Sequence, residues 1–281
     1  MTRKASAGGA GGGSPGASGE RAAQSGAFSI DGDGGQAAPS PGSGRRPFII
    51  AIDGPAGAGK STAARALAAR LGFALVDTGA IYRTVALAAS RAGIAFDDDA
   101  DLGRLLPSLQ IGFAAGRAGD EQRVMLGEED VSAEIRTPAM SLGASAVSAR
   151  PTVRAGLLEL QRRLATAPGQ RGAVLEGRDI GTVVFPDADA KFFLTAAPAA
   201  RARRRHDELV RRGERVTLEA VLSEQERRDR DDSQRAVAPL RPAADALVID
   251  SSDMTLGEVV RTLAAEVEAR LAARGGGAPA P

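Results

Sequence analysis

A glycine-rich stretch near the start of the chain carries the residue types that bind phosphate. GPAGAGKST fits the spacing G-x-x-x-x-G-K-[ST], in which the lysine reaches phosphate oxygens and the following hydroxyl meets Mg²⁺. Glycines leave the backbone free to turn several N–H groups toward one anion. The stretch therefore predicts a nucleotide-phosphate site with Mg²⁺ held through Ser61, made of Gly54, Pro55, Ala56, Gly57, Ala58, Gly59, Lys60, Ser61 and Thr62.

The neighbours of this stretch distinguish a phosphate loop from a chance match. A chain with 35 glycines can meet such a pattern by accident. Here, however, the apolar residues 48–53 (FIIAID) predict a buried strand, and 62–71 (TAARALAARL) predict an amphipathic helix. A strand, a loop and a helix in this order are what the motif requires.

A second cluster, DTGAIYR, follows the next short apolar run. In an open sheet of parallel strands, ligands bind at the carboxyl ends of the strands, so Asp77, Thr78 and Arg83 are expected over the same crevice as the phosphate loop. The alternative is a helix cap, with Asp77 or Thr78 capping a helix and Arg83 in solvent. The two interpretations are compatible.

A third cluster, LEGRDIGTVVFPDA at 175–188, again follows a predicted strand. Glu176, Arg178 and Asp179 stand in a glycine-flanked turn, and a buried turn avoids three charges unless they are paired or face a ligand. Arg178 is a candidate phosphate clamp, and Asp179 is a candidate acceptor for an exocyclic amine. A structural ion-pair cluster remains the alternative.

Residues 201–235 are rich in arginine but nearly balanced in charge. Eleven arginines face nine acids, and the segment has no aromatic residue for base stacking, so it gives little of the field that binding to RNA needs. The composition fits a mobile helical flap whose guanidiniums close on phosphoryl oxygens, or a salt-bridged helix pair in solvent. We assign no role to His206.

Composition excludes several classes of site and compartment. The chain has no cysteine and one histidine, which leaves no disulfide, thiolate site or histidine cluster for a metal. Its net charge of +1 gives no general reason to bind nucleic acid or a membrane surface. Without an apolar signal segment or a run of 18 apolar residues, the cytoplasm is the expected compartment. An organelle transit peptide in the first residues remains the alternative, although such peptides are usually richer in arginine and poorer in glycine.

The pattern from Pro47 onward alternates strand and helix, which predicts an α/β fold with a mostly parallel sheet covered on both faces. The expected strands are 48–53, 74–76, 173–176, 190–195 and 246–250. The expected helices are 60–71, 80–92, 198–211, 217–230 and 255–273.

One segment, about 94–168, interrupts this alternation and is expected to form an inserted subdomain. It should contain a small antiparallel pair at 109–114 and 123–127, followed by helices around 133–148 and 151–166. The Gly, Ala, Ser and Pro of residues 1–46 predict a disordered tail, and 275–281 predict a shorter one. The folded domain is therefore expected at 47–274.

A phosphate loop alone does not name a reaction. GTPases carry an N-K-x-D guanine-reading motif, which is missing here. ATP-driven machines carry a strand of four apolar residues that ends in an acid, and AVLEG at 173–177 is at best a degenerate version. Phosphoryl transfer to a small molecule is thereby favoured.

The ordered motifs IDGPAGAGKST, DTGAIYR, GEEDVSAEIRT, EGRDIGTVVFPDA and RDRDDSQRAVAPLRPAADALVIDS resemble those of bacterial cytidylate (CMP) kinases, in the nucleoside monophosphate kinase superfamily. The resemblance spans Phe48 to about Leu271. It implies a P-loop fold with a five-stranded parallel sheet, an inserted nucleotide-binding subdomain and a helical lid at about 198–216. It also implies phosphorylation of CMP or dCMP with ATP and Mg²⁺. We expect the chain to act as a monomer.

The same resemblance implies roles for individual residues. Lys60, Arg178, Arg228 and Arg235 would be catalytic, and the phosphate loop would bind ATP. The lid arginines would be Arg201, Arg204 and Arg205. Thr78 stands where the family pattern has serine, so it keeps the hydroxyl and adds a methyl group. The CMP site would comprise Asp77, Thr78, Arg83, Ser145, Arg154, Asp179, Arg228, Asp232 and Arg235, with Asp179 on the base or its sugar and Asp232 on the sugar hydroxyls.

Two other functions remain open from the sequence. Another P-loop kinase of small molecules, such as one for uridylate or shikimate, would share the loop and the architecture. A regulatory protein that binds nucleotides or RNA through the arginine-rich segment is the other, but it leaves DTGAIYR and EGRDIG unexplained.

Overall fold

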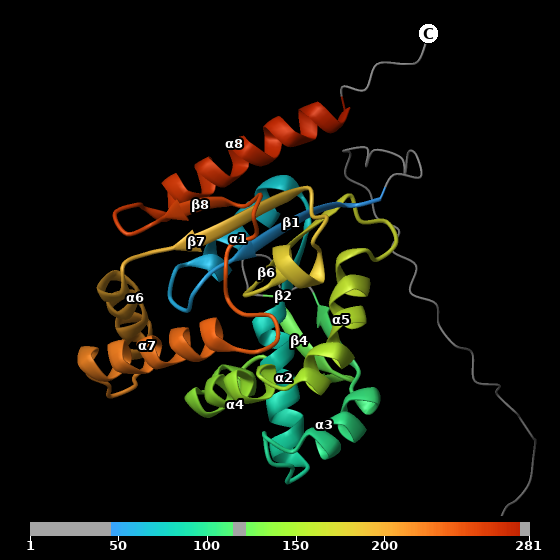
Figure 1. The fold of residues 1–281 in the computed structure, drawn as a ribbon, viewed down its shortest axis with the longest axis vertical. Helices are drawn as coiled ribbons and strands as arrows, with labels where there is room; N and C mark the ends of the chain where they lie inside the picture. Colours follow the sequence, from blue (N-terminus) through green and yellow to red (C-terminus); the bar gives the residue numbers. More distant parts are fainter. Residues whose placement is uncertain (1–45, 115–121, 276–281) are drawn as a thin grey trace, which may run out of the picture. The chain divides into compact units, whose positions relative to one another are not determined.

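Five parallel strands form the main sheet of the structure, a computed structural model that describes residues 46–114 and 122–275 (Figure 1). Their order is β2-β6-β1-β7-β8, and every neighbouring pair is parallel. The bounds are Phe48–Asp53 for β1, Ala74–Asp77 for β2, Gly172–Gly177 for β6, Ala190–Thr195 for β7 and Leu247–Asp250 for β8. The predicted parallel five-stranded α/β sheet is confirmed.

The alternation of side chains along β1 explains why this strand is central. Ile49 and Ala51 face one apolar cluster, and Ile50 and Ile52 face a second cluster on the other side of the sheet. Every residue of the strand is buried. An apolar run that is continuous instead of alternating is what a strand covered on both faces requires.

Helices cover both faces of this sheet. Helices α1 and α8 pack on the face that holds Ile50 and Ile52. Helices α2, α4 (Pro138–Ser148) and α5 (Pro151–Ala165) pack toward the face that holds Ile49. The predicted helices match closely in position, and α2 and α7 begin or end a few residues from the expected bounds. Their bounds are Lys60–Leu71 for α1, Thr78–Arg91 for α2, Pro198–Arg211 for α6, Leu218–Gln234 for α7 and Leu256–Gly275 for α8.

The segment between α2 and β6 forms a subdomain with its own small sheet. The expected antiparallel pair is present as β3, Ile111–Ala114, and β4, Arg123–Leu126, and a short third strand, β5, joins it. The sequence did not predict β5 or the helix α3. The remaining bounds are Glu129–Asp130 for β5, Asp99–Leu105 for α3, Pro138–Ser148 for α4 and Pro151–Ala165 for α5, with short turns of 3₁₀ helix, η1 and η2, at Leu106–Ser108 and Glu134–Arg136.

A salt-bridge cluster braces this subdomain against α2. Arg91, in the last turn of α2, donates hydrogen bonds of 2.7 Å to both carboxylate oxygens of Glu129, and it also contacts Glu134 at 2.9 Å. Because all three side chains are partly in solvent, we expect this cluster to orient the subdomain relative to α2 more than to raise the free energy of unfolding.

The predicted tails fall almost entirely outside the described residues. At the start of the domain, Arg46 pairs with Asp189 at 3.0 Å; at the other end, α8 continues to Gly275. In the part of the chain that the structure describes, no helix is both long and apolar enough to cross a membrane.

Candidate active site

The carboxyl ends of all five parallel strands supply the residues of the candidate site. The phosphate loop follows β1, and Asp77 and Thr78 join β2 to α2. Arg178 and Asp179 follow β6, and the loops after β7 and β8 lead to Arg201 and to Ser251. This is the edge at which open parallel sheets bind ligands, and the residues predicted from separate motifs lie along it.

The phosphate loop has a backbone that only glycine adopts readily. Gly54 has φ of 146°, and a Cβ there would lie 2.0 Å from the carbonyl oxygen of Leu194 on β7. Gly59, with φ of 92°, lies in the left-handed region directly before α1. The loop is therefore fixed in position against β7 while its N–H groups precede the start of a helix, where anions bind.

Two groups hold the carbonyl side of the loop. Arg201 of α6 donates to the carbonyl oxygen of Ala56 at 3.0 Å. The hydroxyl of Ser251, after β8, lies 3.2 Å from the carbonyl oxygen of Ala58 and 3.0 Å from that of Thr195, which share its one proton. Gln225 of α7 lies over Gly57, where a Cβ would approach its Nε2 within 2.7 Å. Helices α6 and α7 thus lie against the loop.

Lys60 occupies a buried, strongly charged position. Its Nζ donates to the carbonyl oxygen of Pro55 at 2.8 Å. Burial, together with the positive charge of Arg178, lowers the pKa of Lys60 to about 7. The buried carboxyl of Glu176 lies close to it, and burial and the nearby Asp77 raise the pKa of Glu176. Such a lysine gains most from an added negative charge, which a nucleotide phosphate supplies.

Asp77 caps α2 and also pairs with a predicted site residue. Its Oδ1 accepts from the backbone N–H of Ala80 at 2.8 Å, and its Oδ2 accepts from Arg83 at 3.2 Å. The predicted cap is confirmed for Asp77, while Arg83 is paired and not simply in solvent. The hydroxyl of Thr78 is buried and donates to the carbonyl oxygen of Glu176 at 2.6 Å, which ties α2 to β6.

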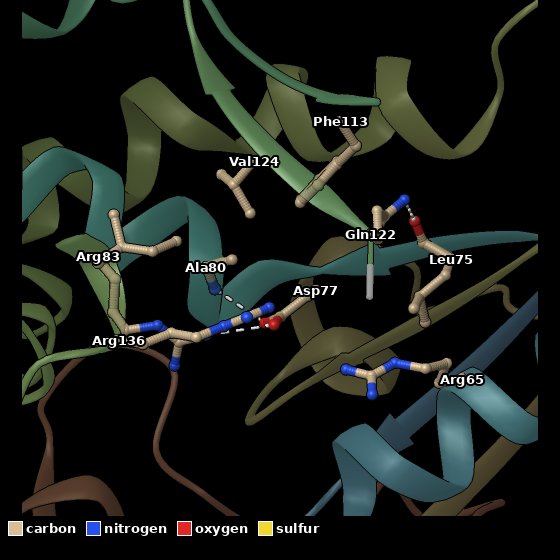
Figure 2. Close-up of a pocket in the computed structure, with 10 residues that line it drawn as sticks. Arg65, Leu75, Asp77, Ala80, Arg83, Phe113, Gln122, Val124 and Arg136 are labelled. Carbon is tan, nitrogen blue, oxygen red and sulfur yellow. Dashed lines mark hydrogen bonds and ion pairs between the residues drawn. The ribbon is translucent and has the colours of Figure 1, made fainter. Parts of the chain in front are cut away.

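A small pocket opens beside Asp77, between the start of α2 and the inserted subdomain (Figure 2). Arg65 of α1 and Arg136 of the subdomain line it together with Arg83. Gln122, before β4, donates to the carbonyl oxygen of Leu75 at 3.1 Å and so joins the subdomain to β2. The sequence did not identify Arg65, which lies outside the motifs. Arg136 lies within the motif GEEDVSAEIRT, but the motif by itself indicated no role for it.

The turn after β6 joins the sheet to helices α7 and α5. Arg178 donates from Nε to Oδ2 of Asp232 on α7 at 2.9 Å, whereas Asp179 forms a buried ion pair with Arg154 of α5. Although burial acts in the opposite direction, Arg178 and Arg235 hold the pKa of Asp232 below its usual value. The structure thus contains the ion pairs that the sequence offered as one interpretation of this cluster. The same residues can still bind a ligand.

Arg154 is held from three sides. Besides Asp179, it donates to the carbonyl oxygen of Ser148 at 3.1 Å and lies over the ring of Tyr82, 5.8 Å from the centroid. Arg235 points to the same Ser148 at 3.5 Å, and the backbone carbonyl oxygen of Ser145, one turn earlier on α4, accepts from the Ser148 hydroxyl at 3.0 Å. Arg154, Ser145 and Arg235, which were predicted separately along the sequence, thus meet around Ser148 in the fold.

Four guanidinium groups of the site keep buried N–H groups without a partner among the described residues. These atoms are Nε of Arg83, Arg154 and Arg228 and Nη2 of Arg235. Burial and the repulsion of Arg178 lower the pKa of Arg228 to about 10. Since an unpaired buried donor is costly, this many at one edge of a sheet indicates a site for an anionic ligand with several oxygens.

The three predicted lid arginines are paired with protein groups in this structure. Arg201 is buried and, besides Ala56, contacts Asp229 at 2.6 Å. Arg204 contacts Ser251 at 3.1 Å, and Arg205 pairs with Glu208 at 2.9 Å. Their contact with phosphoryl groups stays a prediction, which for Arg201 requires the present bonds to break.

Oxygen groups suited to Mg²⁺ lie beside Lys60. Ser61, on the first turn of α1, hydrogen-bonds with the buried carboxylate of Glu176. A hydroxyl and a carboxylate are hard oxygen donors, which Mg²⁺ prefers, and their small number matches an ion carried in mainly by a nucleotide. No group of three or more metal-binding acids, histidines or cysteines is found within the described ranges.

Comparisons with known proteins agree with this geometry. A family model described as "Cytidylate kinase" matches residues 50–269. The cytidylate kinase of Geobacter sp. strain M21 is 53% identical over 224 residues, which cover 80% of this chain and 94% of that protein. The cytidylate kinase of Mycobacterium leprae is 49% identical over 216 residues, 77% of this chain and 93% of that protein.

A solved structure shows a more distant likeness. The crystal structure of a gluconokinase from Sinorhizobium meliloti aligns over 82% of this chain and 96% of its own, with 18% identity and a TM-score of 0.41. That likeness is too distant to carry a conclusion.

Proposed function

The chain belongs to the cytidylate kinase family, and we propose that it transfers the γ-phosphoryl group of ATP to CMP or dCMP, giving CDP or dCDP. It is an enzyme of the phosphotransferase class, as its relatives are. We further propose that it works as a monomer in the cytoplasm, with Mg²⁺ bound together with ATP.

The donor side is assigned to the phosphate loop, Gly54 to Thr62. Its backbone N–H groups and the start of α1 would hold the ATP phosphates, and Lys60 would exchange its bond to Pro55 for one to a phosphate oxygen. Ser61, backed by Glu176, would hold Mg²⁺. When bound, that ion would neutralise part of the charge on the phosphates.

The acceptor side is assigned to the residues around the turn after β6. Arg83 and Arg228, whose Nε atoms are unpaired, together with Arg178 would bind the CMP phosphate. Arg154 and Asp179 would read the cytosine with Ser145, and Asp232 and Arg235 would contact the sugar and phosphate. Thr78 would bind through its oxygen, since its proton is donated to Glu176.

The chemistry asks for position and positive charge more than for a base. Phosphoryl transfer places donor and acceptor oxygens in line and spreads charge over three equatorial oxygens. Lys60, Arg178, Arg228 and Arg235 would stabilise that charge. The CMP phosphate is itself the nucleophile and is largely deprotonated at neutral pH, so the reaction needs no histidine.

The observation that carries this proposal is the set of unpaired buried guanidinium N–H groups at the edge that also holds Lys60. A coupled assay of ADP release with CMP, dCMP, UMP and AMP, at fixed ATP and Mg²⁺, tests it. We expect turnover with CMP and dCMP far above that with UMP and AMP. A preference for UMP would instead indicate a uridylate kinase, and no turnover with any of the four would refute the proposal.

A further inference from the structure

One buried carboxylate lies between the phosphate loop and the turn that carries Arg178 and Asp179. Asp53 is the last residue of β1 and directly precedes Gly54. Its Oδ1 accepts from the backbone N–H of Ile180 and its Oδ2 from that of Gly181, both at 2.8 Å. The residue is 4% exposed, so water does not substitute for these bonds.

The turn that Asp53 holds is irregular. Residues Ile180–Val184 form a single turn of π-helix, η3, whose start has no side-chain cap from its own neighbouring residue. Such turns are uncommon, and their first N–H groups need an acceptor from elsewhere. Asp53, 127 residues earlier in the chain, supplies it to two of them.

Directly before η3, the two residues that join it to β6 point in different directions. Arg178 bonds to Asp232 on α7, and Asp179 pairs with Arg154 on α5. A shift of the turn therefore moves the phosphate clamp and the base contact together. Since a displacement of about 1 Å at a reacting centre can cost a factor of about 10² in rate, the support of this turn matters for the reaction.

We infer that Asp53 is a positioning residue for the acceptor nucleotide: by accepting two backbone hydrogen bonds from η3, it fixes Arg178 and Asp179 relative to the phosphate loop. It touches neither substrate in this assignment. The inference rests on the proposed function, because it concerns the CMP side of the same site.

The charges that face Asp53 come from several elements. Asp179, of the turn, and Lys60, of α1, act on it electrostatically, and the aliphatic part of Lys191, on β7, lies beside Gly181 with its ammonium paired to Asp245. Burial is the largest influence and raises the pKa of Asp53 to about 6. Below that pH the carboxyl carries a proton, and one of its oxygens then faces an N–H group as a donor.

The test is the variant Asp53→Asn, which keeps the shape and removes one acceptor. The amide of asparagine can accept from one N–H group but places its own NH₂ against the other. We expect the affinity for CMP, measured by titration calorimetry, to fall about tenfold or more, the scale of one lost hydrogen bond to a charged group. The affinity for ATP should change less than about threefold, because the loop is also held by Arg201 and Ser251.

A matched control variant is available near the first residues of β1, where another carboxylate accepts a backbone hydrogen bond. Asp189 also accepts a backbone hydrogen bond, from Ile49 at 2.8 Å, but it is far along β1 from the site. Asp189→Asn should leave the affinity for CMP unchanged, whatever it does to the melting temperature. Equal losses for CMP and ATP in Asp53→Asn, or unchanged CMP affinity, would overturn the inference.

The pH dependence separates positioning from a general loss of stability. The ratio of CMP affinities, wild type over Asp53→Asn, should shrink from pH 8 to pH 5, because wild-type Asp53 itself becomes neutral with a pKa of about 6. Titration of the CMP phosphate affects both proteins and cancels in the ratio. A ratio that is constant with pH would contradict the inference.

If Asp53→Asn does not fold, a measurement on the wild-type protein still tests the inference. The amide resonances of Ile180 and Gly181 should shift in NMR spectra with a midpoint near pH 6, as Asp53 is protonated. Amides that do not titrate would contradict the inference. Absence of CMP turnover in the wild-type protein would instead refute the proposed function, so the two failures are distinguishable.

Discussion

Arg178 and Asp232, 54 residues apart in the chain, are joined by a hydrogen bond of 2.9 Å from Nε to Oδ2. The bond ties the turn after β6 to α7, and thus a residue assigned to phosphate to a residue assigned to the sugar. Both side chains are largely buried. A change at either one is therefore expected to affect the other.

Removal of the Lys60 ammonium should abolish most of the activity. In Lys60→Ala we expect kcat with CMP to fall on the order of 10³-fold, the scale for loss of a group that stabilises transition-state charge. The far-ultraviolet circular dichroism should be unchanged. Arg70→Ala, which removes an exposed cation at the far end of the same helix, is the control and should leave kcat within about twofold. Unimpaired turnover in Lys60→Ala would exclude the assigned role.

Binding of ATP should take up a proton above neutral pH. Free Lys60, with a pKa lowered to about 7 by burial and by Arg178, is mostly neutral at pH 8, and the added phosphates favour its charged form. We expect uptake that approaches one proton at pH 8 and falls toward zero near pH 6. Calorimetry in buffers of different ionisation enthalpy measures it, and the same uptake in Lys60→Ala would contradict the assignment to Lys60.

Asp232→Ala should alter the preference between CMP and dCMP. If Asp232 accepts from the sugar hydroxyls, the ratio of kcat/KM for CMP over dCMP should fall, in addition to a general loss as Arg178 becomes unpaired. The exposed neighbour Asp231, changed to alanine, should leave both values within about twofold, as surface changes do. An equal loss for the two substrates would indicate a purely structural role.

Asp179→Asn should weaken the choice of base. Because Asp179 is buried and paired with Arg154, its replacement leaves the polar contacts to cytosine incomplete. We expect the ratio of kcat/KM for CMP over UMP to fall by about 10², part of the discrimination that such buried groups provide. The partly exposed pair of Arg150 and Asp99, outside the site, offers a control in Asp99→Asn. An unchanged ratio would remove Asp179 from the base contact.

Gly54→Ala should destabilise the whole domain. Its Cβ would meet the Leu194 carbonyl oxygen at 2.0 Å in a backbone conformation unfavourable for alanine. A cost of about 3 kcal/mol corresponds to a melting temperature lower by about 6–12 °C. Gly112→Ala, where a Cβ meets nothing within 4 Å, should change it little. Similar melting temperatures for the two variants would contradict the close approach of Leu194 to Gly54.

The sequence predicted the parts of the fold that local patterns determine. The continuous apolar run of β1 and the regular spacing of α1 match the structure at both ends, because burial on both faces and a helical stripe each leave a distinct pattern. Helix α3 was not predicted, since DADLGRL carries one buried residue, Leu102, and so shows no periodicity.

The sequence predicted the site residues that belong to a motif. It did not predict the contacts that form where segments distant in the sequence meet. Asp53 could have been noted as an acid at the end of a strand, but its partners Ile180 and Gly181 contribute only backbone N–H groups, which no sequence pattern reveals. Likewise, Tyr82 reads as an ordinary core residue, and only the fold places Arg154 over its ring.

The two contacts with the carbonyl groups of Ala56 and Ala58 bear on how tightly the phosphate loop can bind its donor nucleotide. A loop already fastened from its outer side gives up little conformational entropy when a triphosphate arrives. If Arg201 of α6 moves onto a phosphoryl group, only its bond to Ala56, of these two contacts, has to break, and the contact of Ser251 with Ala58 still holds the loop.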